Sequence, residues 1–140
     1  MIMFEKQELQ GANLDFFLQI CSYQMPEIII INFLTSNQVA NVHEGVIFFF
    51  VFVAYLAKLT HTERKVQAEE QLITLVTDYQ IFTHMKQLVQ NYKETGMLGE
   101  TLKYSIHLIE HLIKLIQFFN HEEAMEIFER QGCLDAIEDL

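Results

Sequence analysis

Two histidines and a glutamate stand close together in the C-terminal half of the chain, in the order His107-Leu108-Ile109-Glu110-His111. On a helix the two histidines lie one turn apart, so their rings can share a Zn²⁺ ion while the glutamate acts as a general base. A zinc-dependent hydrolase is therefore the enzyme class for which the sequence offers a local pattern.

The HxxEH order is that of the inverzincin metallopeptidases, in which a third ligand completes the zinc site. Here Glu122 or Glu123 would have to supply it. In those enzymes the third ligand follows the motif by so many residues that the matching position would lie after 140. A five-residue pattern with two free positions also arises readily by chance. We therefore expect His107 and His111 to be partly exposed residues of a helix, with no metal, no cofactor and no catalytic residue.

Other catalytic patterns do not occur in the sequence. His43, His61 and His84 lack the ExxH spacing of di-iron carboxylate bundles. No GxxxxGK[ST], GxGxxG or GxSxG sequence occurs, which argues against phosphate-binding loops and α/β-hydrolases. These absences favour a binding protein over an enzyme.

The chain is strongly acidic. Nine Lys and Arg residues against 19 Asp and Glu residues give a formal net charge of −10. Such a surface repels phosphate backbones and anionic lipid headgroups, so nucleic acid and membranes are not expected partners. A basic peptide or the basic face of another protein is the complementary partner.

The cysteines and the first residues indicate the compartment. Cys21 and Cys133 lie far apart without metal-binding spacing, so we expect two reduced, buried thiols. The N-terminal residues MIMFEK lack the basic and then apolar segments of a secretory signal. Both features predict a protein of the cytoplasm or the nucleus.

Apolar residues recur every three or four positions, and one proline and five glycines leave little turn chemistry for hairpins. The sequence therefore predicts helices over 14–23, 27–34, 39–59, 63–79, 82–94, 100–119, 122–130 and, in part, 134–140. We expect a bend or break at Gly45 in the third helix. We also expect Val66 to lie on the apolar side of the helix 63–79, and Asn120 to cap the helix 122–130.

The most apolar stretch is Val46–Ala57, with the sequence VIFFFVFVAYLA. Its twelve residues are fewer than the roughly 20 that a membrane span needs. Phe and Val also favour β-structure, so a buried strand is the alternative. Because the apolar pattern continues to Leu59, the stretch is too long for a typical strand, and we predict a helix buried on every side.

The helices follow an order of short, short and long that repeats after about 55 residues. This repeat is longer than the 40–47 residues of armadillo and HEAT repeats. Related turns open the second helix of each group, at Tyr23-Gln24-Met25-Pro26, Tyr79-Gln80-Ile81-Phe82 and Gln131-Gly132-Cys133-Leu134. We therefore predict one domain, 1–140, built of repeats 12–62 and 63–119 and a partial repeat 120–140. The predicted fold is all-α, a right-handed α-solenoid of seven or eight helices.

The segment Glu123–Leu134 resembles the first helix, glycine turn and second-helix start of an armadillo repeat. The run Phe128–Leu140, FERQGCLDAIEDL, is also similar to the last repeat of importin-α, the nuclear import adaptor family. The residues that match its pattern are Glu129, Gly132, Leu134, Asp135, Ile137, Glu138 and Leu140. This match covers about a tenth of the chain, and the remainder is similar in helix order and apolar spacing.

The resemblance implies an armadillo/HEAT-like protein-binding module, such as a nuclear transport adaptor, that holds its partner along the third helices. Importin-α binds basic peptides there through Trp and Asn side chains spaced four apart. The matching positions here are Ala54 and Lys58, then His107 and His111; the chain has no Trp, and Lys58 would repel a basic peptide. The alternative is a helical-bundle subunit of a larger assembly, in which Val46–Ala57 packs against another chain.

The last predicted helix has an apolar edge formed by Leu134, Ile137 and Leu140, with Glu129 and Glu138 nearby. A terminal repeat normally carries a polar outer face. We therefore expect another protein, a second copy in a homo-oligomer or larger complex, or further residues to cover this edge.

Overall fold

The computed structural model describes residues 25–140, and every regular element within that range is helical. The predicted helix at 14–23 lies outside the described residues. The elements are α3 (Met25–Ile29), the π-helical turn η1 (Ile30–Leu34), α4 (Val39–Leu59), α5 (Lys65–Thr77), α6 (Ile81–Gln90), α7 (Tyr92–Thr95), α8 (Gly99–Phe119), α9 (Glu122–Gln131) and α10 (Cys133–Glu138). An all-α fold is thus confirmed for this part of the chain.

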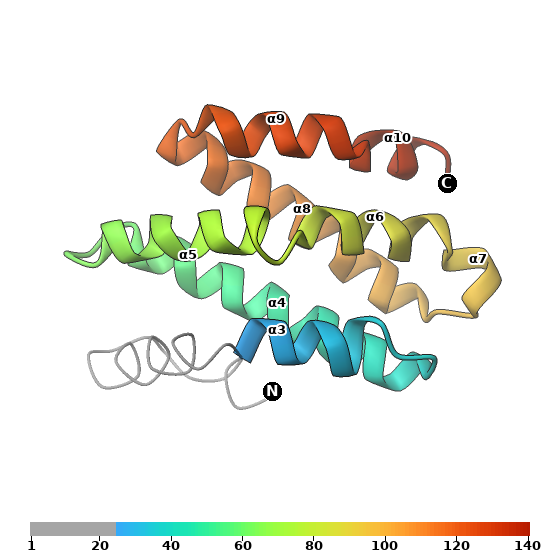
Figure 1. Ribbon diagram of the computed structural model, residues 1–140. Helices are drawn as coiled ribbons and strands as arrows, with labels where there is room; N and C mark the ends of the chain where they lie inside the picture. Colours follow the sequence, from blue (N-terminus) through green and yellow to red (C-terminus); the bar gives the residue numbers. More distant parts are fainter. Residues whose placement is uncertain (1–24) are drawn as a thin grey trace.

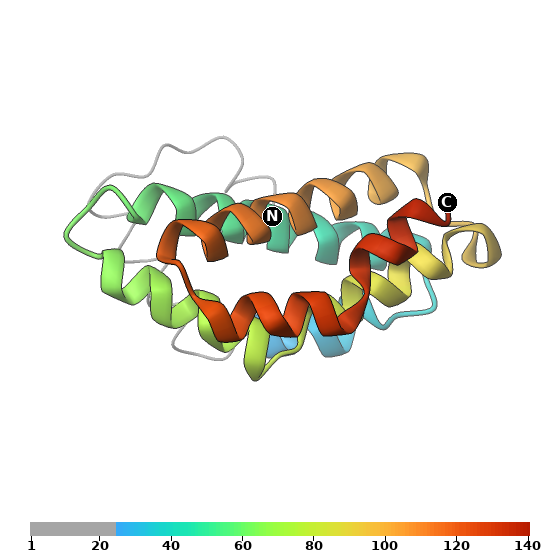
Figure 2. The same ribbon diagram turned by 90° about the horizontal axis from the view of Figure 1, so that it is seen from above.

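The helices form two layers (Figures 1 and 2). The two long helices, α4 and α8, lie side by side in one layer and contact each other along much of their length. Shorter helices form three rows in the other layer: α3 with η1, α5 with α6, and α9 with α10 (Figure 1). Because η1 packs on α4 and α6 packs on α8, the core lies between the layers.

Helix α4 has the predicted bounds and contains the apolar stretch Val46–Ala57, so the strand alternative is wrong. Most of this stretch is buried, with Val46, Phe49, Val53 and Leu56 fully so. Of the helices in residues 25–140, α4 alone has the length and composition to cross a membrane, and 61% of its most apolar 18-residue window is buried within the protein. A core helix of a water-soluble domain meets the same criterion.

Gly45 neither bends nor breaks α4, which runs without interruption from Val39 to Leu59. Its role is to let η1 approach closely. A Cβ atom at this position would lie 2.9 Å from Cδ2 of Leu34 and 3.0 Å from Cβ of Phe33. Both distances are shorter than ordinary van der Waals contact, so a larger residue here would force Leu34 and Phe33 to shift.

Three further local expectations are wrong. The predicted helix 82–94 is divided at Asn91 into α6 and α7. Val66 is 67% exposed, because α5 begins only at Lys65 and buries a stripe that starts at Ala68 instead. Asn120 does not cap α9; it adopts a left-handed conformation (φ 53°) that ends α8. His121 caps α9 instead, because its Nδ1 accepts a hydrogen bond from the backbone N–H of Ala124 at 3.2 Å.

The turns within the second and third rows share an unusual backbone conformation. Gln80 precedes α6 with φ 51° and ψ 48°, and Gly132 precedes α10 with φ 75° and ψ 30°. Glycine adopts this left-handed region freely, whereas glutamine rarely does. These two residues occupy the same position in the two turn sequences that mark the predicted repeat.

Cys133 is buried, as predicted, at the start of α10. Its thiol donates to the backbone carbonyl of Phe82 at 3.3 Å, which ties α10 to α6. Burial raises the pKa of Cys133 to about 11, so the thiol is protonated at neutral pH. Cys21 lies outside the described residues.

Candidate functional site

A line of aromatic and histidine rings follows the seam between α4 and α8; we call it the ring ladder. Phe50 contacts Tyr104 and His111, with ring centroids 5.1 Å and 5.4 Å apart. His43 contacts Tyr104 at 6.3 Å, and His61 beyond the end of α4 contacts Phe118 at 6.5 Å. Residue numbers rise together along both sides, so the two helices run in parallel, as Figure 1 also shows. The members of the ladder are His43, Phe50, His61, Tyr104, His111 and Phe118.

The ring ladder lies on a partly exposed face. Phe50, Tyr104 and His111 are half-buried, whereas Phe118 is 48% exposed. Most of the contacts are edge-to-face or tilted, the geometry that aromatic pairs prefer. The ladder therefore combines fixed rings with surface that a partner could bury.

A polar contact anchors one end of the ladder. Nδ1 of His43 lies 2.7 Å from the hydroxyl oxygen of Thr101, which is fully buried at the start of α8. The hydroxyl of Ser105, also fully buried, donates to the carbonyl of Thr101 at 2.8 Å. The first contact joins α4 to α8, whereas the second lies within α8.

Replacing Thr101 with valine keeps the shape of the side chain but removes the hydroxyl that joins the two helices. We expect the free energy of unfolding to fall by about 1–2 kcal/mol, because His43 loses its partner at a half-buried site. Ser105→Ala is the matched control and should cost less, since it removes a bond within one helix. Urea unfolding measures both, and equal losses would contradict a contribution from the link between helices.

Charged side chains of both signs lie beside the ring ladder. Nζ of Lys65 lies 5.1 Å from the ring centre of Phe118, a cation–π contact. Glu110 pairs with Lys114 at 3.1 Å; this hydrogen bond and charge lower the pKa of the Glu110 carboxyl. Burial lowers the pKa of His111, with the charge of Lys114 as a lesser cause.

The HxxEH residues lie on one partly exposed strip of α8. His107 and Glu110 are 3.9 Å apart, but the nearer partner of Glu110 is Lys114 rather than a histidine. The ring of His111 packs against Phe50. In residues 25–140, no three His, Cys, Asp or Glu side chains gather closely enough to hold a metal ion. The described residues therefore add no third ligand to the two histidines.

Calorimetric titration with Zn²⁺ tests this part of α8. We expect no tight stoichiometric binding, because two histidines one turn apart without a third ligand hold zinc only weakly. His111→Ala should leave the titration unchanged. A one-to-one complex that His111→Ala abolishes would contradict the prediction.

The predicted C-terminal edge divides into exposed and packed parts. Leu134 and Leu140 are 53% and 44% exposed, whereas Ile137 is half-buried against the core. Glu129 on α9 and Glu138 on α10 are exposed on adjoining helices. The structure thus places these five residues in one C-terminal region, with Ile137 contributing more to the fold than to an outer surface.

Light scattering tests whether this region joins chains. We expect the wild type to self-associate at high micromolar concentration. The double variant Leu134→Asp, Leu140→Asp should remove this self-association, because it places charges in the contact. The double variant should keep its thermal stability, because both leucines are largely exposed. A wild type that remains monomeric, with no difference from the variant, would show that the edge does not join copies of the chain.

The ring ladder was not predicted as a unit, although its spacing is visible in the sequence. His43 and Phe50 are seven residues apart, as are Tyr104, His111 and Phe118 in turn. Seven residues are close to two helical turns, so each set lies on one helical face. The spacing could have identified the two faces, but not that they meet.

Comparisons with known protein families, with curated proteins and with solved structures return no match to this chain. The resemblance to armadillo proteins therefore rests on the residues of the C-terminal segment and on the order of the helices.

Proposed function

We propose that the chain is a protein-binding module of the armadillo type, with the ring ladder as a docking surface. The observation that carries the proposal is the pairing of helices one repeat apart. The long helix α4 packs on α8, α5 packs on α9, and α6 packs on α10. Such pairing of equivalent helices is the basis of stacked repeats.

The direction of the helices favours this proposal over a helical-bundle subunit. In an up-and-down bundle, neighbouring helices follow each other through short loops and run antiparallel. Here α4 and α8 run in parallel, and the α5–α6 row lies between them in the sequence (Figure 1). A right-handed superhelical path of these layers is the finer part of the proposal, as is a role in nuclear transport in the cytoplasm or nucleus.

The ring ladder suits a protein partner because its rings are held by neighbours and still expose apolar surface. Rigid aromatic side chains dominate the binding energy of many protein interfaces. Lys65, whose Nζ lies over the ring of Phe118, disfavours a basic segment at this face. A basic partner fits better on α9 and α10, whose exposed acidic residues are Glu122, Glu123, Glu126, Glu129, Asp135 and Glu138.

Affinity capture from a cell extract, quantified by mass spectrometry, tests the docking surface. The bait is the wild-type chain or the variant His107→Glu with Phe118→Ser, which changes Phe118 of the ring ladder and the partly exposed His107 on the same helix. A matched control, Val66→Ser with Gln67→Glu, makes similar changes on exposed residues of α5 in the other layer. We expect a set of proteins retained by the wild type and the control and reduced about tenfold on the α8 variant.

Equal retention by the wild type and the α8 variant would contradict docking at the ring ladder. Light scattering on the same samples separates the alternative function. A stable oligomer that persists at low concentration and retains no other protein would favour a structural subunit over a binding module.

A further inference from the structure

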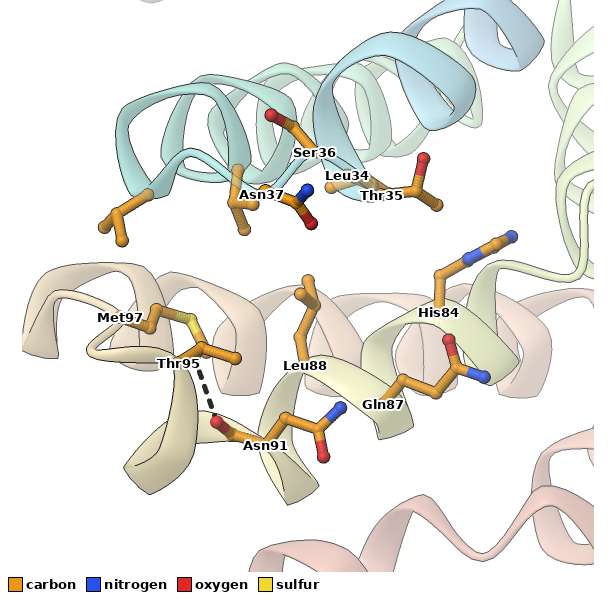
Figure 3. Close-up of a pocket in the computed structure, with 12 residues that line it drawn as sticks. Leu34, Thr35, Ser36, Asn37, His84, Gln87, Leu88, Asn91, Thr95 and Met97 are labelled. Carbon is orange, nitrogen blue, oxygen red and sulfur yellow. Dashed lines mark hydrogen bonds between the residues drawn. The ribbon is translucent and has the colours of Figure 1, made fainter.

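A cavity of about 370 Å³ opens between the turn that joins η1 to α4 and the row of α6 and α7 (Figure 3). Its size falls in the range of ligand pockets. The lining contains no residue of the ring ladder, so the cavity is a separate feature of the molecule. The residues that line it are Leu34, Thr35, Ser36, Asn37, Val39, Val42, His84, Gln87, Leu88, Asn91, Thr95 and Met97.

The lining carries no acidic side chain and neither lysine nor arginine, although the chain has a formal net charge of −10. Burial lowers the pKa of His84, so this ring is neutral at pH 7. A charged ligand would lose hydration here without gaining a counter-charge. The lining therefore favours an uncharged ligand.

The hydroxyl groups of the lining already have partners. Thr35 donates to the carbonyl of Ile31 at 2.8 Å, and Thr95 donates to the carbonyl of Asn91 at 3.0 Å. The oxygen of Ser36 accepts from the backbone N–H of Gln38 at 3.1 Å. The two threonine hydroxyls of this lining are thus donated within the fold, and the oxygen of Ser36 serves as an acceptor.

Three side-chain amides in the lining remain available. Those of Asn37, Gln87 and Asn91 make no hydrogen bond with another residue of the range 25–140. Figure 3 shows Asn37 on the η1–α4 side of the cavity and Gln87 and Asn91 on the α6 side. A side-chain amide offers both donors and an acceptor, as a peptide group does. The two walls therefore offer hydrogen-bond donors and acceptors that can pair with the peptide groups of a main chain.

The spacing of the amides matches an extended chain. Gln87 and Asn91 are four residues apart on and just after α6, an advance of about 6 Å along the helix axis. Two residues of an extended strand advance about 6.6 Å, so the two amides can bind two peptide groups that are two residues apart in the strand. Leu88 lies between them and faces Leu34 across the cavity (Figure 3).

We propose that this cavity binds an uncharged, extended peptide segment. The main chain of the segment pairs with the amides of Asn37, Gln87 and Asn91. One aliphatic side chain of the segment enters between Leu34 and Leu88. This site is additional to the docking surface on the ring ladder and does not depend on it.

A positional-scanning library of acetylated, amidated pentapeptides built from uncharged residues tests the proposal against the full chain. We expect enriched peptides with an aliphatic central residue, and affinities unchanged between low and high salt because no ion pair forms. Gln87→Ala with Asn91→Ala should weaken the best peptide about tenfold, with an unchanged melting temperature because both side chains are exposed. Gln90→Ala, an exposed amide on the same helix but outside the lining, is the matched control.

Several results would overturn the proposal: a library that enriches no peptide, a best peptide that binds the double variant as tightly as the wild type, or binding of small uncharged amides without any peptide. The variant His107→Glu with Phe118→Ser should bind the best peptide normally. Loss of peptide binding and loss of docking at the ring ladder are therefore distinguishable.

Discussion

Phe49→Ala is expected to lower the free energy of unfolding by about 3–5 kcal/mol, the usual effect of removing a buried aromatic ring. Phe49 has no exposed surface and packs edge-to-face on Phe48 at 5.1 Å, with Phe52 at 6.3 Å. The loss combines the transfer of the ring from the core with the cavity left behind. Chemical denaturation monitored by circular dichroism measures it.

The neighbouring residue provides the control. Phe50 points to the partly exposed side of α4, where it contacts Tyr104 and His111. Phe50→Ala should cost about 1–2 kcal/mol, because less ring area is withdrawn from water at this position. If both substitutions cost the same, the two faces of α4 are not buried to different extents, and the assignment of the ring ladder to the outer face is wrong.

Gly45→Leu is expected to destabilise the protein by about 3 kcal/mol, at the upper end of the usual cost of overpacking. The added side chain must displace Phe33 and Leu34, because atoms of both lie within 3.0 Å of the position that its Cβ atom would take. The helix propensity of leucine opposes this loss by only about 1 kcal/mol. Thermal unfolding measures the difference.

Gly99 serves as the matched position, because it also lies in a long helix but a Cβ atom there would meet nothing within 4 Å. Gly99→Leu should leave the stability unchanged or raise it slightly. A loss at Gly99 as large as that at Gly45 would indicate a general intolerance of the long helices rather than a close approach of η1 to α4.

The sequence was most informative where one helix buries a continuous apolar surface. The bounds of α4 were predicted from its composition, and those of α8 within one residue, because many apolar residues contribute to each assignment. Helix ends were harder, since one residue decides each of them. Asn120 is a good cap by type, but its left-handed conformation makes it the end of the preceding helix.

The surfaces depend on contacts between segments far apart in the sequence, which periodicity does not describe. Phe50 and Tyr104 meet only because α4 and α8 are stacked. Asn37 and Asn91 line one cavity because the turn after η1 and the end of α6 belong to neighbouring rows. The left-handed conformation of Gln80 was not predicted, because glutamine rarely adopts it.

The pairing of α4 with α8 also has a consequence for synthesis on the ribosome. Helix α4 ends at Leu59 and α8 ends at Phe119, 60 residues later. At about 5–20 residues per second, the nascent α4 waits roughly 3–12 s for its partner. During that interval its apolar side is available to chaperones and to the machinery that inserts membrane helices. Because this contact joins segments far apart in the sequence, we also expect the chain to fold more slowly than helical proteins built from local contacts.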